Sequence, residues 1–311
     1  MAELHPGNHH RHDHRARGRA GSGTGEMGRV IDAHLHFWNP SLLHYPWLTR
    51  IPALQRAFLP EHFAPLANGS VDGVIVVEAN CEPTEAMAEV EFVDSLATRE
   101  PRVLATVAHV DLLDEDARAP TLRRLAQRDR VAGIRHNIQG HPAGYCLRAA
   151  FVRGVNDVGE HGFTFDLCIT ADQLDDAIEL VRCCPNTRFV LDHCAKPVVR
   201  DDAFLSWALS LERLAVYERV SCKVSGLLTE ARPDQRSAES LRPYVEHVHM
   251  CFGAERLLYG GDWPVCTLAG GETIWREIVN GLTAAWSPSD RQAFYSDNAI
   301  RLYGLARHAN L

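Results

Sequence analysis

Eight short runs rich in valine, isoleucine and leucine recur along the chain, and their spacing limits the folds that it can adopt. The runs cover residues 30–37, 71–79, 102–110, 131–137, 163–169, 188–194, 219–226 and 256–262. Neighbouring runs start roughly 25 to 40 residues apart, which leaves room for a strand, a crossover helix and two loops. The pattern therefore predicts repeated units of one strand and one helix.

The segments between the runs have helical spacing. Ala86, Val90, Val93 and Ala97 fall at positions i, i+4, i+7 and i+11, which places one apolar stripe along a helix. The same spacing recurs over residues 204–215. Each of these segments is therefore predicted to pack one face against the strands.

Eight apolar strands separated by amphipathic helices favour a parallel sheet that is covered on its outer face. Eight is also the number of strands that closes into a (β/α)8 barrel. An open doubly wound sheet is the alternative, but no glycine-rich phosphate loop follows the first run. We therefore expect an α/β protein with a (β/α)8 barrel and with its chemistry at the carboxyl ends of the strands.

The 311 residues divide into two unequal parts. Residues 1–27 are rich in glycine, arginine and histidine and have no apolar periodicity, so we expect a disordered tail. They also lack the apolar stretch of a secretory signal. Residues 28–311 are expected to form a single barrel domain, since their length is typical of this fold.

Composition excludes several classes of partner. A net charge of −8 and scattered lysine and arginine residues argue against a nucleic-acid-binding surface. No apolar run approaches the roughly 18 residues of a membrane span. The nine cysteines are odd in number and several lie inside apolar runs, which indicates reduced thiols in a cytoplasmic protein. We expect a small-molecule partner, and a homo-oligomer is compatible with this composition.

His34 and His36 follow the first apolar residues of the chain. Side chains alternate between the two faces of a strand, so both imidazoles are predicted to project to one side, with Ala33 and Leu35 on the other. Two converging imidazoles are half of an open catalytic metal site, in which a few protein ligands hold a divalent ion. A pair of packed histidines is the alternative, so other strands must supply further ligands.

Polar side chains accumulate where the apolar runs end, although burying an unpaired charge is strongly unfavourable. They are Glu78, Asn80, His109, Asp111, Arg135, His136, Asn137, Asp192, His193, Lys196, Lys223, Ser225 and Asp262. In a barrel, these strand ends surround one mouth. We interpret His109 and Asp111 as loop or capping residues rather than ligands.

Several of these residues have both a functional and a structural interpretation. Asp262 follows Gly260 and Gly261, which allow a ligand or a backbone to approach closely, so a functional role is favoured over a helix cap. Asp192 and His193 should face opposite ways in a strand, so only one should enter the barrel. We place His193 in the site and Asp192 behind it as a supporting group.

The basic residues are also ambiguous. Lys223 is most simply the ion-pair partner of a buried carboxylate, with a direct contact to substrate as the alternative. Arg135 offers a planar fork of donors that suits a substrate oxygen or, equally, Glu78. We include Arg135, His136 and Lys223 among the candidate substrate-binding residues.

Aromatic residues and prolines concentrate just after the first run, in residues 38–48. Trp38, Tyr45 and Trp47 predict either a hydrophobic lid over the barrel mouth or a wall against which a compact ring stacks. The two roles are compatible, so all three are candidate substrate-binding residues.

Five motifs, in order along the chain, resemble those of the amidohydrolase superfamily, in its amidohydrolase family 2. They are His34-x-His36, GIRH at 133–136, LDHCAKP at 191–197, KVSG at 223–226 and YGGDWP at 259–264. The chain looks most like the sugar-lactone hydrolases of that family, the L-fuconolactonase and L-rhamnonolactonase branch, which is related to 2-pyrone-4,6-dicarboxylate lactonase. The resemblance covers nearly everything after the tail and implies a (β/α)8 barrel.

The resemblance also implies that His34, His36 and His193 surround the site and that Asp262 acts on water. Metal-rich members of the superfamily carry a bridging carboxylated lysine on strand four and a histidine on strand five, and neither is found here. We therefore expect one divalent ion, Zn²⁺, or catalysis without a metal. The candidate ligands are His34, His36, Glu78, His193 and Asp262.

The reaction that we expect is hydrolysis of a lactone, such as L-fucono- or L-rhamnono-lactone. The candidate catalytic residues are Asp262 as the base for water, His193 beside it, and Arg135 as a stabiliser of the oxyanion. A Gly-x-Ser-x-Gly motif is absent, so a covalent serine route is unsupported.

Two other functions compete with the lactonase. A metal-dependent nonoxidative decarboxylase of an aromatic or unsaturated acid, from the same superfamily, would need a zinc-bound histidine on strand five. A barrel that only binds a ligand would leave the polar strand ends unexplained.

Overall fold

Eight parallel strands form one ring in the computed structural model, which describes residues 28–67, 70–201 and 203–305. The strands follow chain order around the ring, each paired with the next. They are β1 (Ile31–Leu35), β2 (Gly73–Val77), β3 (Val103–His109), β4 (Val131–Arg135), β5 (Thr164–Leu167), β6 (Arg188–Leu191), β7 (Val220–Val224) and β8 (Leu257–Tyr259).

The ring closes between β1 and the segment that follows β8. The Asp262 amide donates to the His34 carbonyl at 2.7 Å, and the His36 amide donates to the Trp263 carbonyl at 2.8 Å. The predicted (β/α)8 barrel is therefore confirmed. The same two hydrogen bonds place the Asp262 backbone beside the two histidines.

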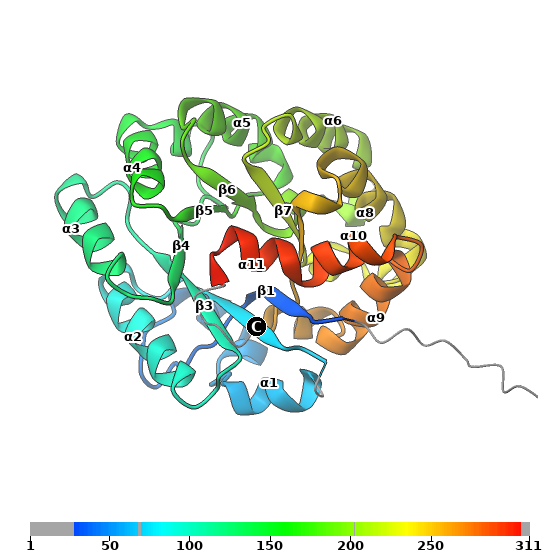
Figure 1. The fold of residues 1–311 in the computed structure, drawn as a ribbon, viewed down its shortest axis with the longest axis horizontal. Helices are drawn as coiled ribbons and strands as arrows, with labels where there is room; N and C mark the ends of the chain where they lie inside the picture. The colour runs from blue at the N-terminus through cyan, green and yellow to red at the C-terminus, as the bar shows by residue number, and fades with distance from the viewer. Residues whose placement is uncertain (1–27, 68–69, 202, 306–311) are drawn as a thin grey trace, which may run out of the picture.

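At least one helix follows every strand and covers the outside of the ring (Figure 1). The helices are α1 (Pro60–Ala67), α2 (Ala86–Ala97), α3 (Glu115–Leu125), α4 (Ala149–Glu160), α5 (Leu174–Cys183), α6 (Phe204–Ala215), α7 (Leu227–Glu230), α8 (Ala238–Phe252), α9 (Glu272–Leu282), α10 (Pro288–Gln292) and α11 (Asn298–Leu302).

Local sequence determines which face of a helix is buried and where a helix begins. On α2, the predicted stripe is buried at Val90, Val93 and Ala97 and half-buried at Ala86. Helix α3 begins where the Asp114 side chain accepts hydrogen bonds from two amides of the first turn, and Ser237 caps α8 through one such bond. These side chains satisfy amides that have no partner inside the helix.

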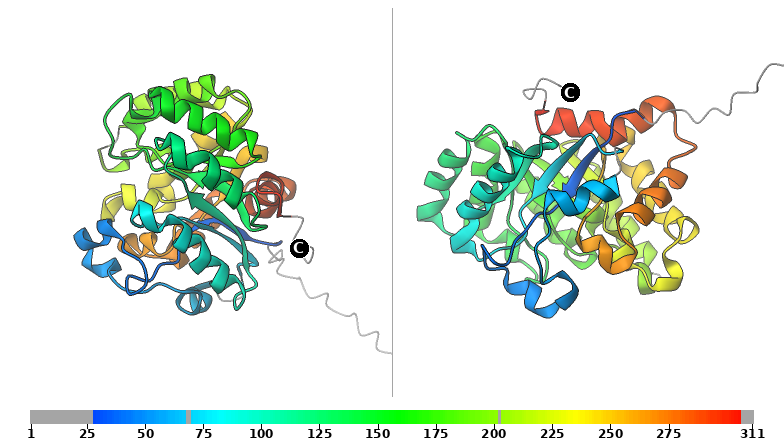
Figure 2. Two further views of the ribbon diagram at one scale, coloured as in Figure 1. Left: turned by 90° about the vertical axis from the view of Figure 1, so that its left-hand side faces the viewer. Right: turned by 90° about the horizontal axis from the view of Figure 1, so that it is seen from below.

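The interior of the barrel is filled by an apolar cluster that includes Ile31, Ala33, Val77 and Val190. Tyr303, at the end of α11, joins this cluster and donates from its hydroxyl to Asp166 at 3.4 Å. In Figure 2, α10 and α11 lie across one end of the barrel, and the segment after β1, in blue, extends toward the other. The mouth at the carboxyl ends of the strands is therefore the accessible end.

Three further expectations concern the whole chain. Residues 1–27, where we expect a tail, lie outside the described residues. Among the described residues, no helix is long and apolar enough to cross a membrane. All nine cysteines lie in this part of the chain and are free thiols.

Candidate active site

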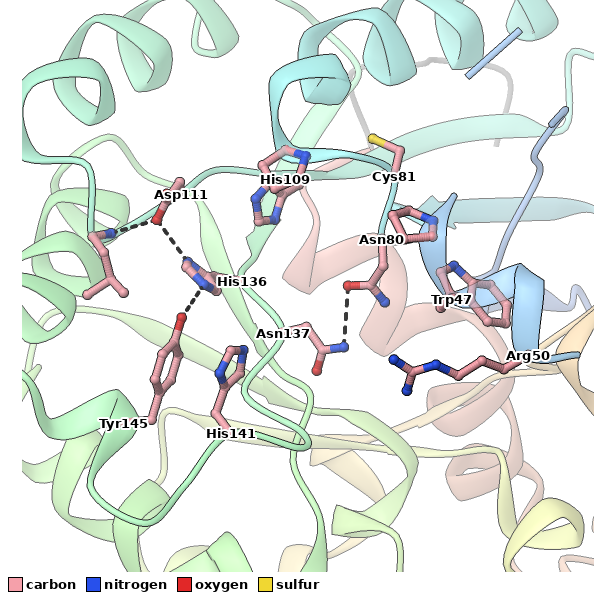
Figure 3. A pocket seen from close by; sticks show the side chains of 13 residues that line it. Trp47, Arg50, Asn80, Cys81, His109, Asp111, His136, Asn137, His141 and Tyr145 are labelled. Atoms are coloured by element: carbon pink, nitrogen blue, oxygen red, sulfur yellow. Dashed lines mark hydrogen bonds and ion pairs between the residues drawn. The ribbon is translucent and has the colours of Figure 1, made fainter. Parts of the chain in front are cut away.

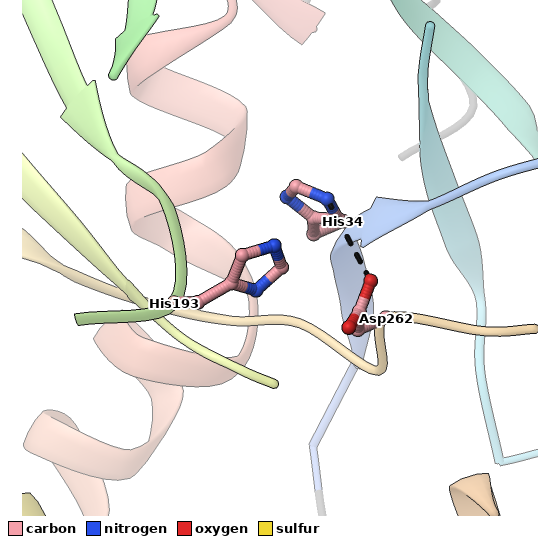
Figure 4. Close-up of side chains that lie close together, drawn as sticks. All are labelled: His34, His193 and Asp262. Atoms are coloured by element: carbon pink, nitrogen blue, oxygen red, sulfur yellow. Dashed lines mark ion pairs between the residues drawn. The ribbon is translucent and has the colours of Figure 1, made fainter. Parts of the chain in front are cut away.

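Four predicted side chains meet at the carboxyl end of the barrel. They are His34 and His36 from β1 and just after it, His193 from the turn after β6, and Asp262 from the segment after β8. Ligand atoms of His34, His193 and Asp262 all lie within 4.8 Å of one another (Figure 4). His36 Nε2 lies 3.2 Å from His34 Nε2 and 3.7 Å from Asp262 Oδ1.

Each of the three imidazoles is held through its Nδ1 atom by a different oxygen. The contacts are His34 to Asp192 Oδ1 at 3.1 Å, His36 to the Val77 carbonyl at 2.8 Å, and His193 to Ser225 Oγ at 2.8 Å. An imidazole that donates from Nδ1 keeps a lone pair on Nε2. A carboxylate and a carbonyl only accept, so His34 and His36 donate from Nδ1 and offer Nε2 lone pairs, as metal-binding histidines do. The Ser225 hydroxyl can accept from His193 or donate to it.

The alternation predicted for β1 holds only in part. Leu35 and Phe37 pack into the outer core, but Ala33 joins the cluster inside the barrel. The pairing of β1 with β2 shifts its register between Asp32 and Leu35. This irregularity allows His34 to enter the site although its neighbour Ala33 also faces inward.

Asp192 and His193 both face the interior of the barrel, so the prediction that they face opposite ways was wrong. His193 lines the inner cavity, and Asp192 lies behind His34 as the supporting group that we expected. Strand β6 ends one residue before them, and alternation no longer applies. His193 has a φ of 52°, and the chain stays in the left-handed region through Lys196, at a cost of roughly 1 kcal/mol or more per residue. A hydrogen bond of 2.8 Å from Trp207 Nε1 to the Cys194 carbonyl helps to hold this turn.

A buried ion-pair network supports the histidines. Arg135 pairs with Glu78 and lies 3.2 Å from Asp192 Oδ2, and Lys223 pairs with Asp166 and lies 3.1 Å from Asp192 Oδ1. All five side chains are buried. Asp192 therefore joins the two halves of the network and also contacts His34.

The pKa values within the network follow from burial and pairing. Burial alone would raise the pKa of Asp192, but Lys223, His34 and Arg135 together hold it well below its ordinary value. Burial raises the pKa of Asp166 to about 6, although Lys223 lies beside it. At neutral pH, Asp192 is therefore the ionised group that orients His34.

Asp262 is also ionised at neutral pH. Burial acts to raise its pKa, but the neighbouring His193 and His36 outweigh burial and hold the pKa below its ordinary value. Burial lowers the pKa values of His34 and His193 well below the ordinary value of histidine. A carboxylate beside neutral imidazoles is the protonation state that metal binding requires.

This donor set could hold a single metal ion. Nitrogen and carboxylate ligands at about 2.0–2.2 Å in tetrahedral geometry separate neighbouring donor atoms by roughly 3.3 Å. His34 Nε2 lies 3.2 Å from His36 Nε2 and 3.9 Å from Asp262 Oδ1, and His36 Nε2 lies 3.7 Å from Asp262 Oδ1. Glu78, a predicted ligand, is not in this group, because its carboxylate faces Arg135 and the Asn80 amide.

A cavity of about 270 Å³ lies over the cluster and is called the inner cavity below. His36, His193 and Asp262 line it together with Arg135 and Lys196. At its rim, the Lys196 ammonium donates to the Gln139 side chain. The inner cavity therefore combines an ionised carboxylate with two cationic side chains.

The predicted substrate-binding residues divide into those that line a cavity and those that do not. Trp47 lines the inner cavity, but Trp38 and Tyr45 are buried in the aromatic packing below it. Lys223 is completely buried in its ion pairs and does not line the inner cavity, so the structure favours the ion-pair interpretation over contact with substrate. His136 lines a second, larger cavity (Figure 3).

Sequence reasoning missed Asp166, and it found Ser225 without assigning it a role. Asp166 is the partner of Lys223, and Ser225 orients His193. The signal for Asp166 was a lone acidic residue inside an apolar run, where a charge needs a buried partner. The glycines before Asp262 do allow close approach, but to protein side chains rather than to a ligand. A Cβ at Gly260 would lie 2.9 Å from the Cβ of His34 and 3.0 Å from that of Ser225.

Comparisons with known proteins agree with this geometry. The chain is 32% identical over 311 residues to an L-fucono-1,5-lactonase of Burkholderia multivorans, covering 91% of this chain and 99% of that protein. It is 24% identical over 217 residues to an L-rhamnono-gamma-lactonase of Scheffersomyces stipitis, covering 62% and 65%. A crystal structure of an amidohydrolase from B. multivorans with bound zinc has a TM-score of 0.79 and 29% identity, covering 89% and 99%. Amidohydrolase family sequence features match residues 31–305, so this chain belongs to the amidohydrolase family.

Proposed function

We propose that this protein hydrolyses sugar lactones, with Asp262 as the general base that activates water. The observation that carries the proposal is the position of Asp262, which is ionised and lines the inner cavity with His36 and His193. The relatives named above as L-fucono-1,5-lactonase and L-rhamnono-gamma-lactonase support this substrate class. We assign the reaction to a barrel domain formed by residues 28–311.

The reaction begins when Asp262 takes a proton from a water molecule that attacks the lactone carbonyl carbon. The carbonyl oxygen gains negative charge as the tetrahedral intermediate forms. Arg135 uses three of its five N–H groups on Glu78 and Asp192, so two N–H groups are left for this oxygen. His193, which contacts Ser225, lines the inner cavity, where the attacking water would lie.

The ring bond between the carbonyl carbon and the ring oxygen then breaks. Asp262 returns its proton to the departing ring oxygen, which becomes a hydroxyl group. The product is a hydroxy acid, whose carboxyl group ionises at neutral pH. Each lactone that is opened therefore releases one acid equivalent.

We further propose that one Zn²⁺ ion is held by His34 and Asp262 with His36 or His193. An ion bound there would supply Lewis acidity to the reaction. The charges in and around the site support a cation, because four buried carboxyl groups outnumber two buried cations, Arg135 and Lys223, and the half-buried Lys196. The four are Glu78, Asp166, Asp192 and Asp262.

A nonoxidative decarboxylase is less well supported. It would need a zinc-bound histidine on β5, and β5 (Thr164–Leu167) has none. The polar side chain of β5 that meets the network is Asp166, which pairs with Lys223. Release of carbon dioxide from an aromatic or unsaturated acid, rather than acid from a lactone, would favour this alternative.

The proposal is tested with a pH indicator and a panel of sugar lactones that includes L-fucono-1,5-lactone and L-rhamnono-1,4-lactone. Purified full-length protein is assayed as isolated, after chelation, and after zinc is restored. We expect one acid equivalent per lactone and an activity that falls on chelation and returns with zinc. If no lactone is opened in any of the three forms, the proposed function is wrong.

A further inference from the structure

A second cavity, of about 540 Å³, adjoins the inner cavity and has no part in the reaction described above (Figure 3). We call it the outer cavity. Trp47, Asn80 and Asn137 line both cavities and so form the threshold between them. Asn137 Nδ2 donates to Asn80 Oδ1 at 3.3 Å at this threshold.

The sizes of the two cavities suit different parts of one ligand. Ligand pockets usually measure about 300–1,000 Å³, and the inner cavity, at about 270 Å³, suits a single compact ring. The outer cavity has about twice that volume. A substrate that fills only the inner cavity would leave the polar side chains of the outer cavity unused.

Two polar groups of the outer cavity have hydrogen-bonding capacity to spare. His136 Nδ1 accepts from the Leu112 amide at 3.0 Å, so its Nε2 donates to the Tyr145 hydroxyl at 2.9 Å. The Tyr145 hydroxyl hydrogen is then left to donate elsewhere. His109 Nδ1 donates to the Arg135 carbonyl at 3.2 Å, and His109 Nε2 is a buried acceptor with no partner among the described residues.

Flat aromatic surfaces form other parts of the same wall. The His141 and Tyr145 rings are stacked with centroids 3.8 Å apart and an interplanar angle of 9°. Trp47 is fixed by a hydrogen bond of 2.7 Å from Nε1 to the Ala79 carbonyl. Fixed aromatic faces give apolar contact at little cost in conformational entropy, and the C–H faces of a sugar ring fit against them.

The charge of the outer cavity favours a neutral ligand. It contains one cation, Arg50, which pairs with none of the described residues, and one acidic side chain, Asp111. Burial lowers the pKa of His136 to about 4, so this ring adds no charge at neutral pH. A hydroxyl-rich ring supplies both donors and acceptors to such a surface, whereas an anion would meet only one cation.

We propose that the outer cavity binds a second sugar ring, attached to the lactone ring that occupies the inner cavity. The substrates would then be lactones of glycosylated aldonic acids. This inference rests on the proposed function, because it names the class of lactone that the same site opens. Tyr145 and Arg50 are the residues that select the second ring.

The test compares L-fucono-1,5-lactone with derivatives that carry a β-D-glucosyl group on any one of its hydroxyls. For at least one derivative, we expect kcat/KM to exceed that of the parent lactone by about tenfold, the effect of one or two good contacts. Tyr145→Phe and Arg50→Ala should each remove most of this gain and leave the parent lactone unchanged. Arg182→Ala, at an exposed arginine of α5, is the matched control and should change neither rate.

A binding measurement separates this inference from the proposed function. Saturation-transfer NMR with methyl β-D-glucoside and full-length protein should show contact that Arg50→Ala weakens and Arg182→Ala does not. If lactones are opened but no glucosyl derivative is preferred and no glucoside contact is seen, the inference is wrong and the proposed function stands. If no lactone is opened, both are wrong, even where the glucoside still binds.

Discussion

Replacing Lys223 by methionine should destabilise the barrel strongly. The change keeps the length of the side chain and removes a charge that is buried between Asp166 and Asp192 and lies 3.3 Å from His34 Nδ1. Asp192 keeps its contact with Arg135, but Asp166 keeps only the Tyr303 hydroxyl. Removing one partner of a buried ion pair costs roughly 3–5 kcal/mol, because the other charge is left uncompensated.

The loss of stability should also depend on pH. The pKa of Asp166 is already raised to about 6 beside Lys223, and it rises further without that cation. A raised pKa means that stability falls as pH increases toward the folded pKa. Above about pH 6, Asp166 is ionised in the folded wild type, which then loses no further stability through this group. In the variant, Asp166 still holds its proton, so the free energy of unfolding continues to fall. The difference in stability between wild type and variant should therefore grow by about 1.4 kcal/mol per pH unit.

Urea unfolding at pH 5.5, 6.5 and 7.5 measures both effects. Adding Asp166→Asn to Lys223→Met supplies the control, since it removes the titrating carboxyl group and should abolish the pH dependence of the deficit. A loss below about 1 kcal/mol for Lys223→Met, or a deficit equal at all three pH values, would refute the ion-pair network as described.

Three further substitutions test other parts of the site. Glu89 is a buried residue of α2 behind the site, and its carboxyl group accepts a hydrogen bond from the Ala79 amide at 3.0 Å. Burial and then Glu78 raise the pKa of Glu89 to about 8, so the wild type loses stability as pH rises toward that value. Glu89→Gln should therefore be more stable than wild type at pH 8 but not at pH 5, as measured by thermal unfolding. Asp192→Asn should lower kcat about 10- to 100-fold in steady-state assays, because it weakens the contact that orients His34. His34→Ala should lose bound zinc by metal analysis, and full-length His44→Ala, at an exposed histidine, should not.

The fold could be predicted from sequence because its signals are local and repeated. Eight apolar runs gave eight strands in the expected order. However, each strand ends before the predicted apolar run does, on the side of the barrel mouth. The run over 256–262 becomes β8 (Leu257–Tyr259), because the backbone leaves the extended conformation and reaches a φ of 54° at Asp262.

The site could be predicted less completely, because alternation fails where strands end. His193 lies in a left-handed turn that no periodic pattern indicates, and Asp192 is drawn inward by Lys223 and Arg135. The outer cavity depends on Tyr145 and His141, which lie in a connection after β4 with no motif of its own. Such contacts between distant loops become visible only in three dimensions.

The turnover of L-fucono-1,5-lactone by Asp262→Asn tests the central claim most directly. Asparagine tolerates the left-handed backbone of this position, so the variant should fold and unfold like the wild type. We predict that its kcat/KM falls by a factor of about 10² to 10⁴, the usual contribution of a general base. A folded variant that retains more than about a tenth of the wild-type rate would contradict the role of Asp262.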